Sequence, residues 1–125
     1  MTFNTYGDRN NPCLLLLPGL GVSHEIFLPL IKLLEDKFFV IAAGVDGFLI
    51  GEESCFTSVD DQAAKAIAYV QEHLGGHLNV AYGLSLGGKI LSRILERNEI
   101  VILLYLSFMT MIVPGPSPVA SAQGV

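Results

Sequence analysis

Short apolar runs, separated by segments with helical periodicity, restrict the possible fold of this chain more than any other feature. Four such runs occupy residues 13–17, 38–43, 78–82 and 100–106, and a weaker alternating run occupies residues 2–6. Continuous Val, Ile and Leu runs of this length are typical of parallel strands that are covered on both faces. Because right-handed crossovers make successive strands parallel, the sequence predicts an α/β fold with a mostly parallel sheet flanked by helices.

Three helices are predicted between these strands. The first occupies residues 24–36 and has Pro29 in its first turn, where a missing N–H does no harm. Five apolar residues are predicted on the inner face of this helix: Ile26, Phe27, Leu30, Ile31 and Leu34. The second helix is capped by Ser58 and stops at Gly75-Gly76, and the third occupies Leu86–Arg97.

The composition limits the classes of function that the chain can serve. Its 125 residues are enough for one domain, and a content of 51% hydrophobic and 15% charged residues excludes a disordered chain. The net charge of −5 comes without any stripe of Lys and Arg, so nucleic acid is not an expected partner. Two cysteines, Cys13 and Cys55, and a start without a signal-peptide pattern predict a reducing, cytoplasmic location.

An uncharged apolar run occupies residues 100–113. It is shorter than the roughly 18–20 residues that a membrane-spanning helix needs, and its first half predicts a buried parallel strand. Membrane attachment is therefore not expected, although a membrane-peripheral protein anchored by this run is an alternative. Residues 107–125 form an apolar and then Pro/Gly/Ser-rich tail, which we expect to be disordered.

A G-x-S-x-G pattern, formed by Gly83, Ser85 and Gly87, lies between a predicted strand and a predicted helix. A serine at such a sharp turn is held in a strained backbone conformation with its hydroxyl exposed above the strand ends. Side chains two residues before or after it would collide, and the N-terminal N–H groups of the helix can stabilise a developing oxyanion. The alternative is a Gly-rich turn whose serine only caps the helix.

These features together resemble the N-terminal half of the α/β-hydrolase-fold family. A strand runs into Pro18-Gly19-Leu20-Gly21, which is similar to the His-Gly-x-Gly oxyanion loop of that family, with proline in place of histidine. The segment YGLSLGGKIL is similar to its nucleophile elbow. The resemblance covers residues 2–106 and implies that residues 1–106 form a partial α/β-hydrolase domain.

The resemblance implies a serine hydrolase of the carboxylesterase or acyl-hydrolase type, acting on a small-molecule ester or acyl substrate. Ser85 matches the nucleophile, and the backbone N–H groups of Leu20 and Leu86 match the two oxyanion donors. The serine would attack an acyl carbon, and the two N–H groups would hold the tetrahedral oxyanion. No metal and no organic cofactor is implied.

The acid and the histidine of the catalytic triad are missing after the serine. In the family they follow the nucleophile in this order, but here only Glu96 and Glu99 are acidic after Ser85, and no histidine follows His77. We therefore expect a truncated fold that is weak or inactive, with a tail that is foreign to the family from about Leu103 onward.

The other candidate residues are expected to have structural roles. His24 follows the Gly-rich loop and could approach the serine, but we interpret it as a residue of the loop rim. His73 and His77 are expected to be exposed near a helix end, and Asp46 to be structural. The alternative function is a non-catalytic binding module that self-associates through the unpaired edge of the strand at residues 100–106.

Overall fold

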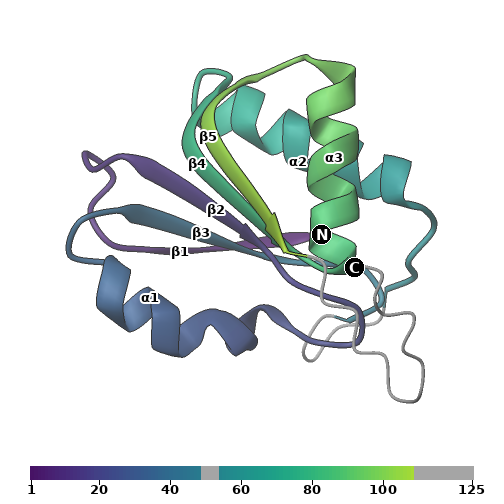
Figure 1. Cartoon of the computed structure of the whole chain (residues 1–125), viewed down its shortest axis with the longest axis horizontal. Coiled ribbons are helices and arrows are strands. Elements are labelled where there is room, and N and C mark those ends of the chain that lie inside the picture. Colours follow the sequence, from purple (N-terminus) through teal and green to yellow (C-terminus); the bar gives the residue numbers. More distant parts are fainter. Residues whose placement is uncertain (49–53, 109–125) are drawn as a thin grey trace, which may run out of the picture.

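The computed structural model describes residues 1–48 and 54–108, which contain a five-stranded sheet with helices on both faces (Figure 1). The strands are β1 (Thr2–Tyr6), β2 (Cys13–Leu17), β3 (Phe39–Gly44), β4 (His77–Leu84) and β5 (Val101–Phe108). Their order in the sheet is β1-β3-β2-β4-β5, and only β1 runs antiparallel to its neighbour. The predicted α/β fold with a mostly parallel sheet is confirmed.

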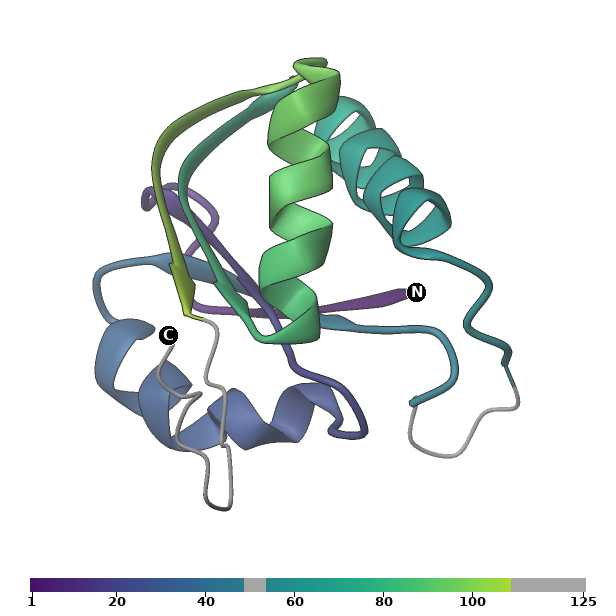
Figure 2. The same ribbon diagram turned by 45° about the vertical axis from the view of Figure 1, so that its right-hand side comes forward.

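Helices cover the two faces of the sheet unequally. A 3₁₀ turn, η1 (His24–Phe27), and helix α1 (Leu28–Leu34) lie on one face, and α2 (Val59–His73) and α3 (Leu86–Arg97) lie together on the other (Figures 1 and 2). The predicted cap of the second helix is confirmed, since the Ser58 hydroxyl oxygen accepts a hydrogen bond from the Asp61 N–H at 3.0 Å.

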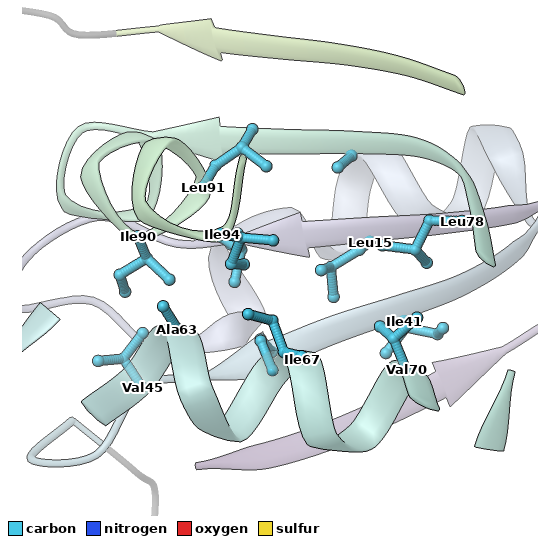
Figure 3. Close-up of a cluster of buried hydrophobic side chains, with 14 of the residues drawn as sticks. Leu15, Ile41, Val45, Ala63, Ile67, Val70, Leu78, Ile90, Leu91 and Ile94 are labelled. Carbon is cyan, nitrogen blue, oxygen red and sulfur yellow. The ribbon is translucent and has the colours of Figure 1, made fainter. Parts of the chain in front are cut away.

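The larger core lies between the sheet and α2 and α3 (Figure 3). Alternate residues of a strand face opposite sides of a sheet, so Leu15 and Leu17 of β2 join this core while Leu14 and Leu16 face α1. All four leucines are at most 5% exposed. Burial on both faces explains why this strand has no polar residue in the sequence.

The first helix differs from the prediction. One continuous helix was expected over residues 24–36, but η1 precedes a shorter α1. Of the five predicted inward residues, Phe27 and Ile31 are buried, whereas Ile26 is 47% and Leu30 is 38% exposed. These two line an open groove of about 510 Å³ beside the sheet, because α1 does not reach across to β5. Pro29 lies in the first turn of α1, as predicted.

The two last strands extend beyond their predicted ends. β4 continues to Leu84 and β5 to Phe108, in parallel register with each other. A parallel strand forms in the first half of the apolar run, as predicted, but the prediction that this strand is buried is wrong, because β5 has a neighbouring strand on only one side among the described residues and is exposed along most of its length. Residues 107–108, which were expected in a disordered tail, belong to β5, and residues 109–125 lie outside the described residues. Across the described ranges, no helix has the length and apolar character needed to cross a membrane.

Candidate active site

The loops that follow β2 and β4 meet at one edge of the sheet. β2 and β4 are parallel neighbours, with Leu17 paired with Gly83, so their carboxyl ends lie side by side. Pro18 and the residues of the Gly-rich loop follow β2, and Ser85 follows β4. Ligand sites of open parallel sheets form at such carboxyl ends.

Ser85 has a backbone conformation that non-glycine residues rarely adopt. Its φ is 55° and its ψ is −112°, directly between the end of β4 and the start of α3. Its N–H donates to the carbonyl oxygen of Phe108 at 2.7 Å, and its carbonyl oxygen accepts from the N–H of Gly88 at 2.8 Å. The side chain forms no capping hydrogen bond with α3, so the alternative of a simple helix cap is wrong.

Glycines allow the two loops to pack closely around this turn. A Cβ on Gly87 would lie 2.1 Å from the carbonyl oxygen of Leu17, and a Cβ on Gly83 would lie 2.5 Å from that of Gly87. A Cβ on Gly19 would lie 3.3 Å from the Cβ of Ser85. Side chains at the first two positions would overlap with backbone atoms, which confirms the steric reason given for the spacing of the motif.

The two predicted oxyanion donors lie in the segments that these contacts bring together. Leu86 is the first residue of α3, where a backbone N–H has no acceptor within the helix. Leu20 follows Gly19, whose backbone packs against Ser85, and the Leu20 side chain is 68% exposed. Backbone N–H groups in this arrangement can stabilise negative charge beside the serine hydroxyl.

Among the described residues, none of the three histidines forms a hydrogen bond with Ser85. His77 begins β4 and Ser85 follows the last residue of that strand, so about 25 Å of extended chain separates them. The His77 ring nitrogen Nδ1 lies 3.0 Å from the carbonyl oxygen of Gly75, and the His73 ring lies against the Tyr69 ring at a tilt of 39°, with 4.5 Å between ring centroids. Among the described residues, no hydrogen bond joins His24, at the start of η1, to Ser85.

Asp46 is a buried structural carboxylate, as predicted. It accepts hydrogen bonds from the Lys65 ammonium at 2.6 Å, from the Gln62 amide at 2.8 Å and from the N-terminal ammonium of Met1. Burial raises the pKa of Asp46, but these hydrogen bonds outweigh burial and hold the pKa well below its usual range. The side chain is therefore an anion that is already paired.

Two features of the site were not predicted. The carbonyl oxygen of Phe108 lies beyond the predicted end of its strand, and no local pattern indicates that it accepts from Ser85. Lys65 was not singled out, although residues four apart on a helix often form ion pairs. Its ammonium nitrogen lies 3.3 Å from a carboxylate oxygen of Asp61.

Within the described ranges, no group of three or more His, Cys, Asp or Glu side chains could hold a metal ion.

Comparison with solved structures gives several similar folds at low sequence identity. An alpha/beta hydrolase family protein from Desulfitobacterium hafniense superposes with a TM-score of 0.80 at 23% identity, covering 85% of this chain and 43% of that one. An esterase from a marine microorganism has a TM-score of 0.71 at 19% identity, covering 84% and 40%. A lipase-esterase related protein from Clostridium acetobutylicum has a TM-score of 0.69 at 20% identity, covering 85% and 45%.

The chain thus spans less than half the length of these solved structures. No curated protein matches the sequence.

The model of the alpha/beta hydrolase fold family, however, matches residues 12–106. The expectation that the chain is foreign to the family from about Leu103 onward is therefore wrong for residues 103–106, which lie within this match. The strand order, the strained serine between β4 and α3 and the match over most of the sequence agree, and the chain belongs to the alpha/beta hydrolase fold family.

Proposed function

We propose that Ser85 is the nucleophile of a serine hydrolase of the carboxylesterase or acyl-hydrolase type. The observation that carries the proposal is the backbone of Ser85, held at φ 55° between a strand and a helix that touch through glycines. A positive φ at a serine costs free energy, and such strain persists where the surrounding structure enforces it. Strain of this kind is common at catalytic nucleophiles on strand-to-helix turns.

In this proposal the Ser85 hydroxyl attacks the acyl carbon of an ester, and the carbonyl oxygen becomes an oxyanion. The N–H groups of Leu86 and Leu20 donate hydrogen bonds to that oxyanion. Each such donor contributes about 3–4 kcal/mol to the stability of the transition state in well-studied enzymes. The contact of Gly19 with Ser85 and the position of Leu86 at the start of α3 support these two roles.

The proposed activity of these 125 residues by themselves is weak or absent. Serine is a poor nucleophile at its ordinary pKa and needs a base that takes its proton. The sequence holds three histidines, of which His73 and His77 have the partners described above and His24 has no bond to Ser85 in the described structure. A missing base can be replaced in part by a small diffusible base, and that replacement provides a test.

The test is labelling with a fluorophosphonate probe, measured by intact mass and peptide mapping, with and without added imidazole. We expect slow labelling at Ser85 that imidazole accelerates, because imidazole can take the proton of the hydroxyl. Ser85→Ala should abolish the labelling. Ser92→Ala, a substitution of an exposed serine on α3, should leave the rate unchanged.

Two results would contradict the proposal. One is the absence of any adduct in folded wild-type protein even at high imidazole concentration, with folding checked by circular dichroism. The other is an adduct on a residue other than Ser85, because the probe would then report general surface reactivity. Either result would leave the serine turn as architecture inherited by a non-catalytic protein.

The second candidate function is a non-catalytic binding or self-association module. The exposed edge strand β5 favours it, since five of its large apolar side chains are more than half exposed. Ester hydrolysis that Ser85→Ala does not change would support this function over catalysis. A cytoplasmic location, a small-molecule ester substrate and a domain boundary at residue 106 remain predictions of the sequence.

A further inference from the structure

The backbone of Ser85 forms hydrogen bonds with two different elements, one on each side of the residue. Its N–H donates to the carbonyl oxygen of Phe108, the last residue of β5, at 2.7 Å. Its carbonyl oxygen accepts from the N–H of Gly88 at 2.8 Å and from that of Lys89 at 3.2 Å, within the first turn of α3. The end of β5 and the start of α3 therefore meet at this one residue.

These hydrogen bonds also determine the direction of the Ser85 side chain. A peptide unit is planar, so the N–H direction fixes the plane of the peptide before Ser85, and the C=O direction fixes the plane of the peptide after it. With both planes held, φ stays at 55° and ψ at −112°, and the Cβ atom that carries the hydroxyl has one direction. The peptide after Ser85 also carries the N–H of Leu86, one of the two proposed oxyanion donors. The two planes therefore set where the Cβ atom lies relative to that donor.

The two elements contribute differently to this arrangement. α3 holds the carbonyl side of Ser85, but φ describes rotation about the bond between the backbone nitrogen and Cα, on the other side of the residue. An L-residue with a positive φ has its Cβ close to neighbouring carbonyl oxygens, so it favours a negative φ when it is free to rotate. The hydrogen bond from the Ser85 N–H to Phe108 opposes this rotation. β5 therefore restrains the part of the strained turn that the hydrogen bonds of α3 leave free.

The register of the strands explains why the acceptor is Phe108. β5 runs parallel to β4, with Leu84 paired with Phe108. In a parallel pair, every second residue of a strand directs both its N–H and its C=O toward the neighbouring strand, and the residues between direct both groups away. Because the Phe108 carbonyl accepts from Ser85, the Phe108 N–H also faces β4, whereas the N–H and C=O of Ser107 face away from it. The Phe108 side chain is 54% exposed, so it can be changed with little effect on the core.

We propose that the backbone carbonyl of Phe108 is a positioning group for the Ser85 nucleophile, so that the pairing of the end of β5 with β4 controls the reactivity of the serine. This inference rests on the proposed function of Ser85. Phe108 lies two residues beyond residues 12–106, the segment that the family model matches. Release of the carbonyl would let the hydroxyl move relative to the two N–H donors, and a misplacement of about 1 Å can cost on the order of 100-fold in rate.

Two proline variants of the full chain test this role. Proline has no N–H, and its ring occupies the place of that hydrogen. In Phe108→Pro the ring would face β4 and separate the end of β5 from Ser85, whereas in Ser107→Pro it would face away from β4, where an edge strand tolerates proline. With imidazole present, fluorophosphonate labelling of Ser85 should be about tenfold slower or more in Phe108→Pro. Labelling of Ser107→Pro, the matched control, should stay close to that of the wild type, and circular dichroism checks that both variants fold.

Hydrogen exchange of the Ser85 N–H, followed by NMR, measures the positioning bond without any reaction. The N–H should be protected in the wild type and in Ser107→Pro, and Phe108→Pro should lose most of this protection. The coupling between the Ser85 amide and Cα protons reports φ, and it should change only in Phe108→Pro. A wild type that is never labelled would contradict the nucleophilic role of Ser85, and the exchange and coupling data would still decide whether Phe108 holds its backbone.

A second pair of variants, Phe108→Gly and Phe108→Ala, decides the question if Phe108→Pro does not fold. Both lose the exposed ring and keep the backbone N–H and carbonyl, but glycine gives the end of the strand more conformational freedom. Phe108→Gly should be labelled about two- to fivefold more slowly than Phe108→Ala, and its Ser85 N–H should exchange faster by a similar factor. Equal rates in this pair would overturn the inference. Equal losses in the two proline variants, or wild-type labelling and protection in a folded Phe108→Pro, would overturn it as well.

Discussion

Gly87 is the residue at which α3 touches the loop that follows β2. In an exposed helix position, replacing glycine by alanine usually stabilises a protein by about 0.5–1 kcal/mol. Here we expect the opposite sign, because the new Cβ would lie 2.1 Å from the carbonyl oxygen of Leu17, which is backbone and cannot rotate away. Gly87→Ala should lower the free energy of unfolding by about 1–3 kcal/mol, measured by urea denaturation.

A helix-propensity effect alone would make Gly87→Ala more stable than the wild type, and that result would contradict the close packing of the two loops. Ser92→Ala on the exposed face of the same helix is the control, and it should change the free energy of unfolding by less than about 0.5 kcal/mol.

Asp46 is the buried charge with the most partners in the described structure. Asp46→Asn keeps the shape of the side chain but removes the anion that Lys65, Gln62 and the N-terminal ammonium share. We expect a loss of about 1–3 kcal/mol in the free energy of unfolding at neutral pH, the usual cost of disrupting buried hydrogen bonds. Urea denaturation of both proteins at pH 7 measures it.

The pH dependence of that difference has a definite sign. The pKa of Asp46 is lowered in the folded protein, so the carboxylate contributes stability above its unfolded pKa and loses it as the pH falls. The gap in stability between wild type and Asp46→Asn should therefore be full at neutral pH and shrink below about pH 4. A gap that grows on acidification would contradict the pairing of Asp46 with these cations.

At the scale of single elements, α2 shows how a cap determines where a helix begins. The Ser58 hydroxyl oxygen accepts from the N–H of Asp61, satisfying one of the backbone donors that the first turn leaves unpaired. Ser58→Ala should lower the free energy of unfolding by about 1 kcal/mol. Thermal denaturation checks this, and an equal loss in Ser92→Ala would show that the effect does not come from the cap.

α1 shows where a pattern within one element was insufficient. The spacing of its apolar residues correctly indicated a helix, but the pattern did not show how much sheet the helix would cover. Ile26 and Leu30 are exposed at the groove because no described element fills the space between α1 and β5. Whether a residue on the apolar face of a helix is buried depends on what lies opposite it, which is a tertiary property.

At the scale of the whole molecule, burial decides how much a leucine contributes to stability. Leu91 of α3 is 1% exposed within the larger core, whereas Leu33 of α1 is 77% exposed. We expect Leu91→Ala to lower the free energy of unfolding by about 2–5 kcal/mol and Leu33→Ala by less than about 0.5 kcal/mol. Urea denaturation compares them, and similar losses would contradict the burial of Leu91 and the exposure of Leu33.

The sequence by itself determined the elements and the candidate nucleophile. The unbroken apolar run of β2 reflects its burial on both faces, Ser58 marks the start of α2, and the glycines around Ser85 reflect a sharp strand-to-helix turn. These features depend on burial and local sterics, which leave a pattern within one segment. The mostly parallel sheet also followed, because crossover handedness restricts how strands and helices can connect.

Only the tertiary structure decided which segments became neighbours. The contact of Gly19 with Ser85, the hydrogen bond from Ser85 to the Phe108 carbonyl and the open edge of β5 all depend on the strand order β1-β3-β2-β4-β5. Strand order arises from how all elements pack together, and residues that are distant in sequence carry no local mark of that arrangement. For this reason the candidate nucleophile was predictable from one motif, whereas the contacts that the neighbouring loop and strand make with it were visible only in the fold.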